Sequence, residues 1–225
     1  MFADPVFPPL DAATPDGLLA VGGDLSVPML LCAYRRGIFP WFCAGQPILW
    51  WSPDPRMILV PEELRLHRSL RQAMAKPGIT VRIDTAFAEV MSACANAPRR
   101  GQEGTWIVQE MQEAYCALHE AGFAHSIETW AGDELIGGLY GVSIGRMFFG
   151  ESMFTRRPNA SKIALAHLAR RLQKEDFPMI DCQMNTAHLA FMGAREIPRS
   201  TFAAQVARLV ELPPAVWEKG DVACR

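Results

Sequence analysis

Three polar side chains interrupt apolar segments in the last third of the chain. Glu151 follows the apolar residues 147–149, and Asp181 and Gln183 lie in the apolar segment 178–183. Burying a carboxyl or an amide group costs free energy unless the group is paired or used in chemistry, so such residues mark candidate functional sites. Because side chains alternate between the two faces of a strand, Asp181 and Gln183 are predicted to share one face, where they could hold and orient an amine. Structural hydrogen bonding is the alternative role for both.

Two other residues invite a nucleophilic interpretation that their surroundings disfavour. Cys182 lies beside Asp181, and a neighbouring carboxylate raises the pKa of a thiol, which disfavours the reactive thiolate. Strand alternation points Cys182 to the opposite face, where we expect it to belong to the core. Ser143 lies in a Gly-x-Ser-x-Gly pattern (residues 141–145), but a serine-hydrolase elbow requires a helix after the serine. The residues that follow have the composition of a strand, so we expect a hairpin there.

Neither the cysteines nor the histidines show the spacing of a metal site. The chain contains six cysteines and five histidines, which form no CxxC and no HxxxH pair. Zinc sites use closer ligand spacing, and a disulfide framework is typical of shorter, secreted chains. We therefore expect buried, reduced thiols, no metal and no cofactor.

The charge of the chain bears on its partners through local clusters. The net charge of −2 argues against a protein covered with nucleic acid. One basic cluster contains Arg65, Arg68, Arg71 and Lys76, and a second contains Arg156, Arg157, Lys162, Arg170, Arg171 and Lys174. Each cluster is either a solvated helix face or a phosphate-binding site. No apolar run approaches the roughly 20 residues that cross a bilayer, and no signal peptide is recognisable, so we expect a cytoplasmic protein that does not enter a membrane.

The elements that must position these residues divide into two parts. Residues 1–62 are rich in Pro, Gly and Trp and predict a small N-terminal subdomain. It is expected to contain a helix, with Ser26 as N-cap and Gly37 just after its end, and a short strand at 56–60. Its tryptophans belong either to a core or to the wall of a pocket: Trp41, Trp50 and Trp51.

Residues 63–225 predict a larger α+β domain. Helices are predicted at 64–75, after residue 84 or 85, at 108–122, at 160–174, from about 186 and from about 200. Strands are predicted at 79–83, 125–131, 134–145, 146–154 and 178–183, and short turns make the middle three antiparallel. This order is that of an N-acetyltransferase-like domain, with a mixed, mostly antiparallel sheet flanked by helices and a cleft where two neighbouring strands diverge. An acetyl-CoA-dependent member would carry an [RQ]xxGx[GA] loop before the helix at 160–174, and residues 155–162 lack it.

Ordered motifs run through nearly the whole chain. They include GLLAVGGDLS (17–26), AYRRGIFPWF (33–42), ILWWSPDPR (48–56), GTWI (104–107), FFGESMF (148–154), NASKIALAHL (159–168), IDCQ (180–183) and HLAFMGAREIPR (188–199). Together they resemble the leucyl/phenylalanyl-tRNA–protein transferase family. The resemblance implies transfer of Leu or Phe, and less well Met, from aminoacyl-tRNA to proteins with N-terminal Arg or Lys, which marks these proteins for the N-degron pathway. It also implies that tRNA rather than CoA is the carrier, in agreement with the missing loop.

Residue by residue, the resemblance places the polar site on Glu151, Asp181 and Gln183. We expect Asp181 to orient Gln183, Gln183 to hold the attacking amine, and Glu151 to bind the α-amino group of the transferred residue or the terminal adenosine. The aminoacyl side-chain pocket falls on Trp41, Trp106, Leu139, Phe148, Met153, Leu165, Leu168 and Ile180. The basic patch for the tRNA acceptor arm falls on Arg68, Arg71 and Lys76.

We expect a monomer that binds aminoacyl-tRNA and acceptor proteins. Two alternatives stay open. The first is a CoA-dependent N-acyltransferase, and the second is a non-catalytic adaptor that binds tRNA or peptide.

Overall fold

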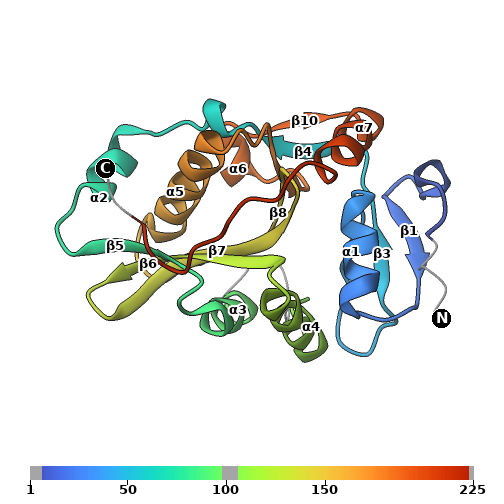
Figure 1. Cartoon of the computed structure of the whole chain (residues 1–225), viewed down its shortest axis with the longest axis horizontal. Coiled ribbons are helices and arrows are strands. Elements are labelled where there is room, and N and C mark those ends of the chain that lie inside the picture. Colours follow the sequence, from blue (N-terminus) through green and yellow to red (C-terminus); the bar gives the residue numbers. More distant parts are fainter. Residues whose placement is uncertain (1–6, 98–105, 223–225) are drawn as a thin grey trace.

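The computed structural model describes residues 7–97 and 106–222, which form two β-sheets with helices around them (Figure 1). A three-stranded sheet has the order β1-β3-β2, and an eight-stranded sheet has the order β10-β4-β9-β8-β7-β6-β5-β11. Among the described strands of the larger sheet, β8 and β9 pair in parallel and the other neighbours are antiparallel. The predicted α+β class and the mixed, mostly antiparallel sheet are confirmed.

The small sheet belongs to the N-terminal part of the chain. It consists of β1 (Leu18–Val21), β2 (Phe39–Pro40) and β3 (Leu49–Trp51), with the helix α1 (Val27–Arg35) and the 3-10 turn η1 (Leu10–Ala12) nearby. The helix predicted between Ser26 and Gly37 is confirmed. Ser26 has the extended backbone of an N-cap, and Gly37 has φ 72°, a conformation that favours glycine.

The three N-terminal tryptophans divide between the two expected roles. Trp50 is core, because it is fully buried and its indole nitrogen donates to the carbonyl oxygen of Gly22 at 2.8 Å. Trp51 donates to the carbonyl oxygen of Trp41 at 2.7 Å, and the two rings meet edge to face. Trp51 thereby holds Trp41, which lines the cavity described below.

The larger sheet collects strands from the whole length of the chain. Its strands are β4 (Arg56–Leu59), β5 (Ile79–Ile83), β6 (Ala124–Ala131), β7 (Glu134–Ile144), β8 (Met147–Thr155), β9 (Ile180–Gln183), β10 (Arg195–Ile197) and β11 (Gly220–Asp221). The antiparallel run β6-β7-β8 is confirmed, and Ser143 lies in β7 before the turn into β8, so no nucleophile elbow forms.

The position of β4 differs from the expectation. We placed this strand at the end of the N-terminal subdomain, but it lies between β9 and β10 in the larger sheet, and all four of its residues are buried. A short apolar strand can pair with strands distant in sequence, and composition does not reveal which ones it pairs with. The boundary near residue 62 stays a prediction.

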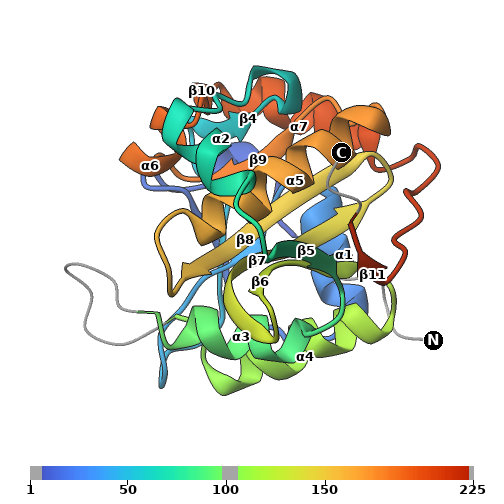
Figure 2. The same cartoon turned by 90° about the vertical axis from the view of Figure 1, so that its left-hand side faces the viewer.

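Helices cover both faces of the larger sheet (Figures 1 and 2). One face carries α2 (Arg68–Met74) and α5 (Ala160–Lys174), and the other carries α3 (Phe87–Ala95) and α4 (Gln109–Glu120). Two further helices, α6 (Ala187–Phe191) and α7 (Arg199–Leu209), flank β10 in the sequence. The helix α5 packs closely because Gly137 of β7 lacks a side chain, and a Cβ there would lie 2.5 Å from Cβ of Ala160. No helix in the described ranges is long and apolar enough to cross a membrane.

The helix α2 is shorter than the predicted 64–75. The 3-10 turn η2 (Pro61–Glu63) precedes it, and residues 64–67 are not helical. Leu64 and Leu66 both pack against the core on the α5 side, which is the two-residue spacing of an extended chain. The last helix, α7, begins after Pro198 rather than at Ser200.

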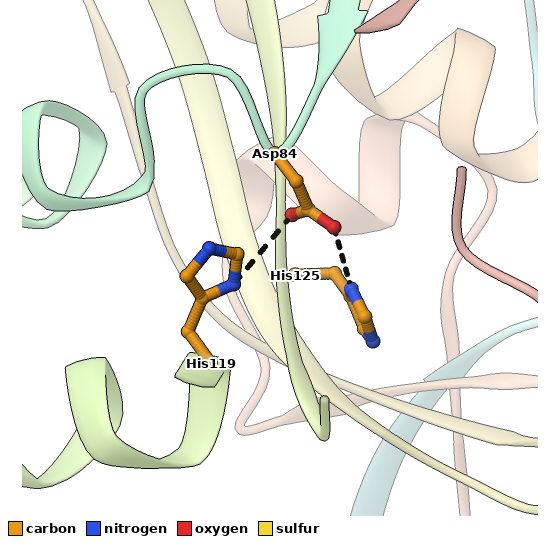
Figure 3. Close-up of side chains that lie close together, drawn as sticks. All are labelled: Asp84, His119 and His125. Carbon is orange, nitrogen blue, oxygen red and sulfur yellow. Dashed lines mark hydrogen bonds and ion pairs between the residues drawn. The ribbon is translucent and has the colours of Figure 1, made fainter. Parts of the chain in front are cut away.

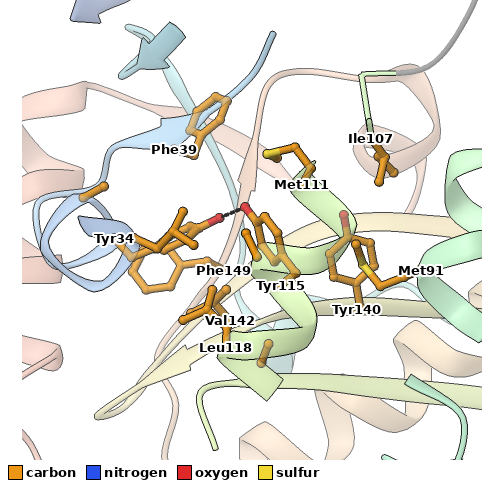
Figure 4. Close-up of a cluster of buried hydrophobic side chains, with 14 of the residues drawn as sticks. Tyr34, Phe39, Met91, Ile107, Met111, Tyr115, Leu118, Tyr140, Val142 and Phe149 are labelled. Atoms are coloured by element: carbon orange, nitrogen blue, oxygen red, sulfur yellow. Dashed lines mark hydrogen bonds between the residues drawn. The ribbon is translucent and has the colours of Figure 1, made fainter. Parts of the chain in front are cut away.

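A cluster of buried side chains joins the N-terminal part to the larger sheet. Figure 4 shows Tyr34 of α1 and Phe39 of β2 packed with Tyr115 and Met111 of α4 and with Phe149 of β8. The hydroxyl oxygens of Tyr34 and Tyr115 lie next to each other in this apolar setting. Because a buried hydroxyl needs partners, these two tyrosines point to a polar site next to the core.

The cysteines are less buried than expected. All five that the structure describes are free thiols: Cys32, Cys43, Cys94, Cys116 and Cys182. Only Cys94 among them is fully buried, and Cys43 is exposed. Cys224 lies outside the described residues. The expectation of buried thiols therefore holds for Cys94 alone within the described ranges.

Candidate active site

The site begins where β8 and β9 separate. These parallel strands are paired only at Phe148 with Ile180 and at Phe149 with Asp181. Just beyond, each strand has an extra residue relative to its other neighbour. Glu151 is extra on β8 against β7, and Cys182 is extra on β9 against β4. Such β-bulges bend a strand and re-aim its side chains, and they are common beside active sites.

The bulge on β9 interrupts the regular alternation of side chains. Asp181 pairs with Ile58 and Gln183 pairs with Met57, two consecutive residues of β4 whose side chains belong to different cores. Gln183 has φ 61°, outside the strand conformation, so alternation does not place its side chain, and the side chains of Asp181 and Gln183 both line the cavity described next. Cys182 is half-buried, packs against the core on the α5 side as expected, and also lines the cavity. Strand alternation alone could not have revealed this inserted residue.

A mostly apolar cavity of about 300 Å³ occupies the space beside the diverging strands. All eight residues predicted for the aminoacyl pocket line it: Trp41, Trp106, Leu139, Phe148, Met153, Leu165, Leu168 and Ile180. Glu151, Asp181 and Gln183 line it as well. The structure thus brings together eleven residues that are far apart in the sequence, from the segment after β2, the segment before α4, the larger sheet and α5. Its volume is at the lower end of ligand pockets, which span about 300–1,000 Å³.

Glu151 is the centre of the polar network in the cavity wall. Its Oε1 accepts hydrogen bonds from the hydroxyl of Tyr34 at 2.7 Å and from the amide nitrogen of Gln183 at 2.9 Å. Its Oε2 accepts from the hydroxyl of Tyr115 at 3.1 Å. Tyr34 comes from the N-terminal part and Tyr115 from α4, so three distant segments fix one carboxyl group.

Burial raises the pKa of Glu151 to about 7. The hydrogen bonds from Tyr34 and Tyr115 oppose this shift, the charge of Asp181 adds to it, and Arg56 opposes it. Burial also raises the pKa of Tyr34 and of Tyr115 well above the usual range, so both phenols remain donors at neutral pH. A carboxyl group with a pKa near the working pH can accept and release a proton.

Asp181 is held by Arg56, a residue that the sequence analysis did not single out. The guanidinium donates from Nε to Oδ1 at 2.8 Å and from Nη2 to Oδ2 at 2.6 Å, and both side chains are at most 1% exposed. Arg56 also lies over the rings of Phe39 and Phe202, 4.8 and 4.6 Å from their centroids. Asp181 contacts Gln183 through the backbone, because Oδ1 accepts from the Gln183 amide N–H at 2.9 Å. Asp181 therefore fixes the bulge that presents Gln183.

Sequence reasoning also missed the two tyrosines and His188. Tyr115 was predicted on the apolar face of its helix. A hydroxyl group on that face needs a hydrogen-bond partner, and this need was the signal that could have revealed a polar site. His188 of α6 lines the cavity, and burial, with Lys162 nearby, lowers its pKa, so its imidazole is neutral at physiological pH.

The predicted tRNA-binding residues lie apart from the cavity lining. Arg68, Arg71 and Lys76 are exposed on or just after α2, and none forms an ion pair with a residue that the structure describes. In the second basic cluster, Arg157 pairs with Glu134 and Arg171 with Glu175. Ion pairing does not by itself distinguish the two clusters, because Arg156, Lys162, Arg170 and Lys174 of the second cluster also form no ion pair with a described residue.

Two histidines that looked scattered in the sequence meet at Asp84, just after β5 (Figure 3). Nδ1 of His125 donates to Oδ2 of Asp84 at 2.7 Å, and Nδ1 of His119 lies 3.9 Å from Oδ1. Nδ1 of His119 also lies 2.7 Å from the carbonyl oxygen of Ala124, which can only accept, so this nitrogen carries a proton. These bonds tie β5, α4 and β6 together, and none of the three side chains lines the cavity.

The fold and the cavity define an α+β protein whose larger sheet opens between β8 and β9 into an apolar pocket with a buried acid network. Residues 58–207 match the family described as "Leucyl/phenylalanyl-tRNA protein transferase", and residues 23–54 match its "N-terminal domain". The chain belongs to the leucyl/phenylalanyl-tRNA–protein transferase family, as the sequence motifs indicated.

Two relatives illustrate the similarity. The leucyl/phenylalanyl-tRNA–protein transferase of Nitrosomonas europaea is 60% identical over 215 residues, which cover 95% of this chain and 91% of the relative. That of Nitrosospira multiformis is 58% identical over 224 residues, which cover 99% and 94%. Among solved structures, that of L-PGS from Bacillus licheniformis matches with a TM-score of 0.39 and 10% identity over 82% of this chain and 59% of that one.

Proposed function

We propose that the protein transfers Leu or Phe, and less well Met, from aminoacyl-tRNA to the α-amino group of proteins with N-terminal Arg or Lys, marking them for N-degron degradation. The observation that carries the proposal is the cavity, in which the eight apolar residues expected to bind the transferred side chain adjoin Glu151 and Gln183. Membership of the family supports the same reaction. We further propose that the protein acts in the cytoplasm as a monomer.

The transferred side chain occupies the apolar part of the cavity. Trp41, Trp106 and Phe148 supply flat walls, and Met153 supplies an adaptable one. A pocket of this kind favours Leu, Phe and Met over β-branched side chains, because branching at Cβ places bulk next to the reacting carbonyl.

The reaction is aminolysis of an ester. The α-amino nitrogen of the acceptor attacks the aminoacyl carbonyl carbon, the C–N bond forms, and the C–O bond to the tRNA ribose breaks. An α-ammonium group has a pKa near 8, so it loses its proton readily. The resemblance assigned Glu151 to the α-amino group of the transferred residue or the terminal adenosine. We propose instead that Glu151, with a pKa of about 7, accepts the proton of the acceptor, and that the proton then passes to the leaving ribose oxygen.

Gln183 positions the attacking amine. Its amide nitrogen donates to Glu151, so its amide oxygen can accept from the amine. Asp181 acts indirectly. Its charge is neutralised by Arg56, and its carboxylate holds the backbone of Gln183. Holding amine and ester in line supplies much of the acceleration.

We also propose that the larger part of the chain, from about residue 63, is an acetyltransferase-like domain. The early separation of the parallel pair β8 and β9 supports this assignment. The absence of a pyrophosphate loop at residues 155–162 disfavours CoA as the carrier.

The test mixes the purified protein with radiolabelled Leu-tRNA and a peptide that begins with Arg. A peptide that differs only by an N-terminal Glu is the acceptor control, and Ile-tRNA is the donor control. We expect label in the Arg peptide, none in the Glu peptide, and transfer from Ile-tRNA reduced by about 10- to 100-fold. A requirement for acetyl-CoA would favour the CoA-dependent acyltransferase, and binding of both partners without transfer would favour the adaptor.

A further inference from the structure

The helix α6 connects the cavity to the basic helix α2. Thr186, His188 and Leu189 line the cavity, and Phe191 ends the helix less than one turn, about 5 Å, further along. At that end, His67, the residue before α2, has its Nε2 3.2 Å from the carbonyl oxygen of Phe191. Figure 2 shows α2 and α6 on the same side of the molecule. A strand of RNA that runs from α2 along α6 would therefore reach residues of the cavity lining.

Phe191 is an exposed aromatic ring at this crossing. It is 54% exposed. The other large apolar side chains that are exposed in the described ranges are not aromatic. Its ring stacks on that of His67, with 3.9 Å between centroids and 18° between planes. A second ring stacked on one face of an exposed ring fixes its orientation and leaves the other face accessible. Such rings serve as stacking platforms for bases of single-stranded nucleic acid.

The charges around the ring suit a polyanion. Nζ of Lys162 lies 5.8 Å from the Phe191 centroid, near the outer limit of a cation–π contact. Arg68 directly follows His67, and Arg71 lies one turn further along α2. A base that replaces the Lys162 ammonium over the ring leaves this ammonium free to pair with the adjoining phosphate.

We propose that Phe191, braced by His67, stacks a base of the unpaired 3′ end of the donor tRNA, next to the terminal nucleotide that enters the cavity. The proposal rests on the proposed function and adds a contact to its donor. An acceptor peptide fits this surface poorly, because its N-terminal Arg or Lys would meet Lys162, Arg68 and Arg71.

The experiment compares two donors that differ in the nucleotides next to the terminal one. Leu-tRNA carries them, and 3′-leucyl-adenosine lacks them. Phe191→Leu keeps an apolar side chain and removes the ring, and Phe191→Tyr keeps the ring. We expect Phe191→Leu to raise the KM for Leu-tRNA by about 5- to 100-fold, to leave the KM for 3′-leucyl-adenosine unchanged, and to leave kcat unchanged with either donor. Phe191→Tyr retains wild-type values.

Binding measured without turnover separates this proposal from the proposed function. A short RNA that ends in the tRNA 3′ sequence, with 2-aminopurine next to its terminal nucleotide, loses fluorescence when the base stacks. We expect this quenching with wild type and Phe191→Tyr and its loss with Phe191→Leu, even if no transfer occurs. Val21→Ala, at another exposed apolar residue, on β1, is the control and keeps the quenching.

Three results would overturn the proposal. An equal rise in KM for both donors would mean that Phe191 acts through the shape of the cavity. A rise confined to the KM of the acceptor peptide would assign the surface to the peptide. Unchanged KM values and unchanged quenching in Phe191→Leu would remove the contact.

Discussion

Glu151 is a buried carboxyl group, and burying such a group costs free energy unless it is paired or used in chemistry. Burial raises its pKa to about 7, although two phenols and an amide donate to it. The proposed reaction needs the carboxylate, so activity must fall as the pH falls through about 7. We expect kcat/KM to fall about tenfold per pH unit between about 8 and 7, as the acceptor amine becomes protonated, and by up to about a hundredfold per unit below 7, as Glu151 becomes protonated too.

Glu151→Gln tests this assignment. The variant should lower kcat by about 10²-fold or more and lose the inflection near pH 7, while the inflection of the amine remains. Glu134→Gln, which changes an exposed carboxylate, is the matched control and keeps the wild-type profile. Survival of the lower inflection in Glu151→Gln would assign it to another group.

Stability provides a second measurement on the same residue. The folded-state pKa of Glu151 lies above its ordinary value of 4.5, so the folded protein binds this proton more tightly than the unfolded chain. Its contribution to stability is therefore present below pH 4.5 and lost as the pH rises towards 7. Across that interval, Glu151→Gln should become progressively more stable relative to wild type in chemical unfolding.

At the scale of elements, regular periodicity was enough to place most of the larger domain. The helix α5 was predicted with its observed ends, because its apolar residues follow a helical repeat, and the hairpins of β6, β7 and β8 followed from their turns. The candidate pocket came from the family resemblance, and its apolar members would otherwise have been assigned to the core.

What the sequence could not provide were long-range pairings and local irregularities. The place of β4 in the larger sheet depends on partners more than 100 residues away, and the bulges at Glu151 and Cys182 depend on the register of neighbouring strands. Arg56 escaped notice for the same reason, since only the folded chain shows that it meets Asp181. These irregularities position the site.

The prediction at the scale of elements concerns the buried ion pair between Arg56 of β4 and Asp181 of β9. Removing one member leaves the other charge buried without its partner, which costs about 3–5 kcal/mol. Arg56→Met and Asp181→Leu should each lower the free energy of unfolding by this amount, and the double variant should lose much less than the sum. The double-mutant cycle is measured by urea unfolding. Additive losses would show that the two side chains act independently.

The same variants separate positioning from chemistry. Because Asp181 contacts the backbone of Gln183, a folded double variant should have a lower kcat and keep the inflection near pH 7. A small displacement of the inflection near pH 7 would reflect the lost charges of Asp181 and Arg56, whereas its complete loss would place Asp181 in the proton transfer itself.

At the scale of the whole molecule, a chain of net charge −2 must bind a polyanion through one local surface. The residues Arg68, Arg71 and Lys76 are exposed at one end of the molecule, and the small N-terminal sheet lies at the other (Figure 1). The cavity lies between them, because Phe39, Pro40 and Trp41 of the N-terminal part close one of its walls. In the proposed function, this arrangement would let the tRNA approach from one side while both parts of the chain enclose the aminoacyl group.

The last prediction concerns this basic surface. Arg68→Ala, Arg71→Ala and Lys76→Ala should each weaken tRNA binding and reduce the slope of log K against log salt concentration by roughly one contact. At saturating tRNA, kcat should be unchanged, because none of the three residues lines the cavity. Binding is measured by fluorescence anisotropy over a series of salt concentrations. Arg35→Ala is the matched control, since Arg35 is exposed but pairs with Glu211 and belongs to α1 at the opposite end. If Arg35→Ala reduced the salt slope as much as the α2 variants, tRNA binding would depend on the overall charge rather than on this surface.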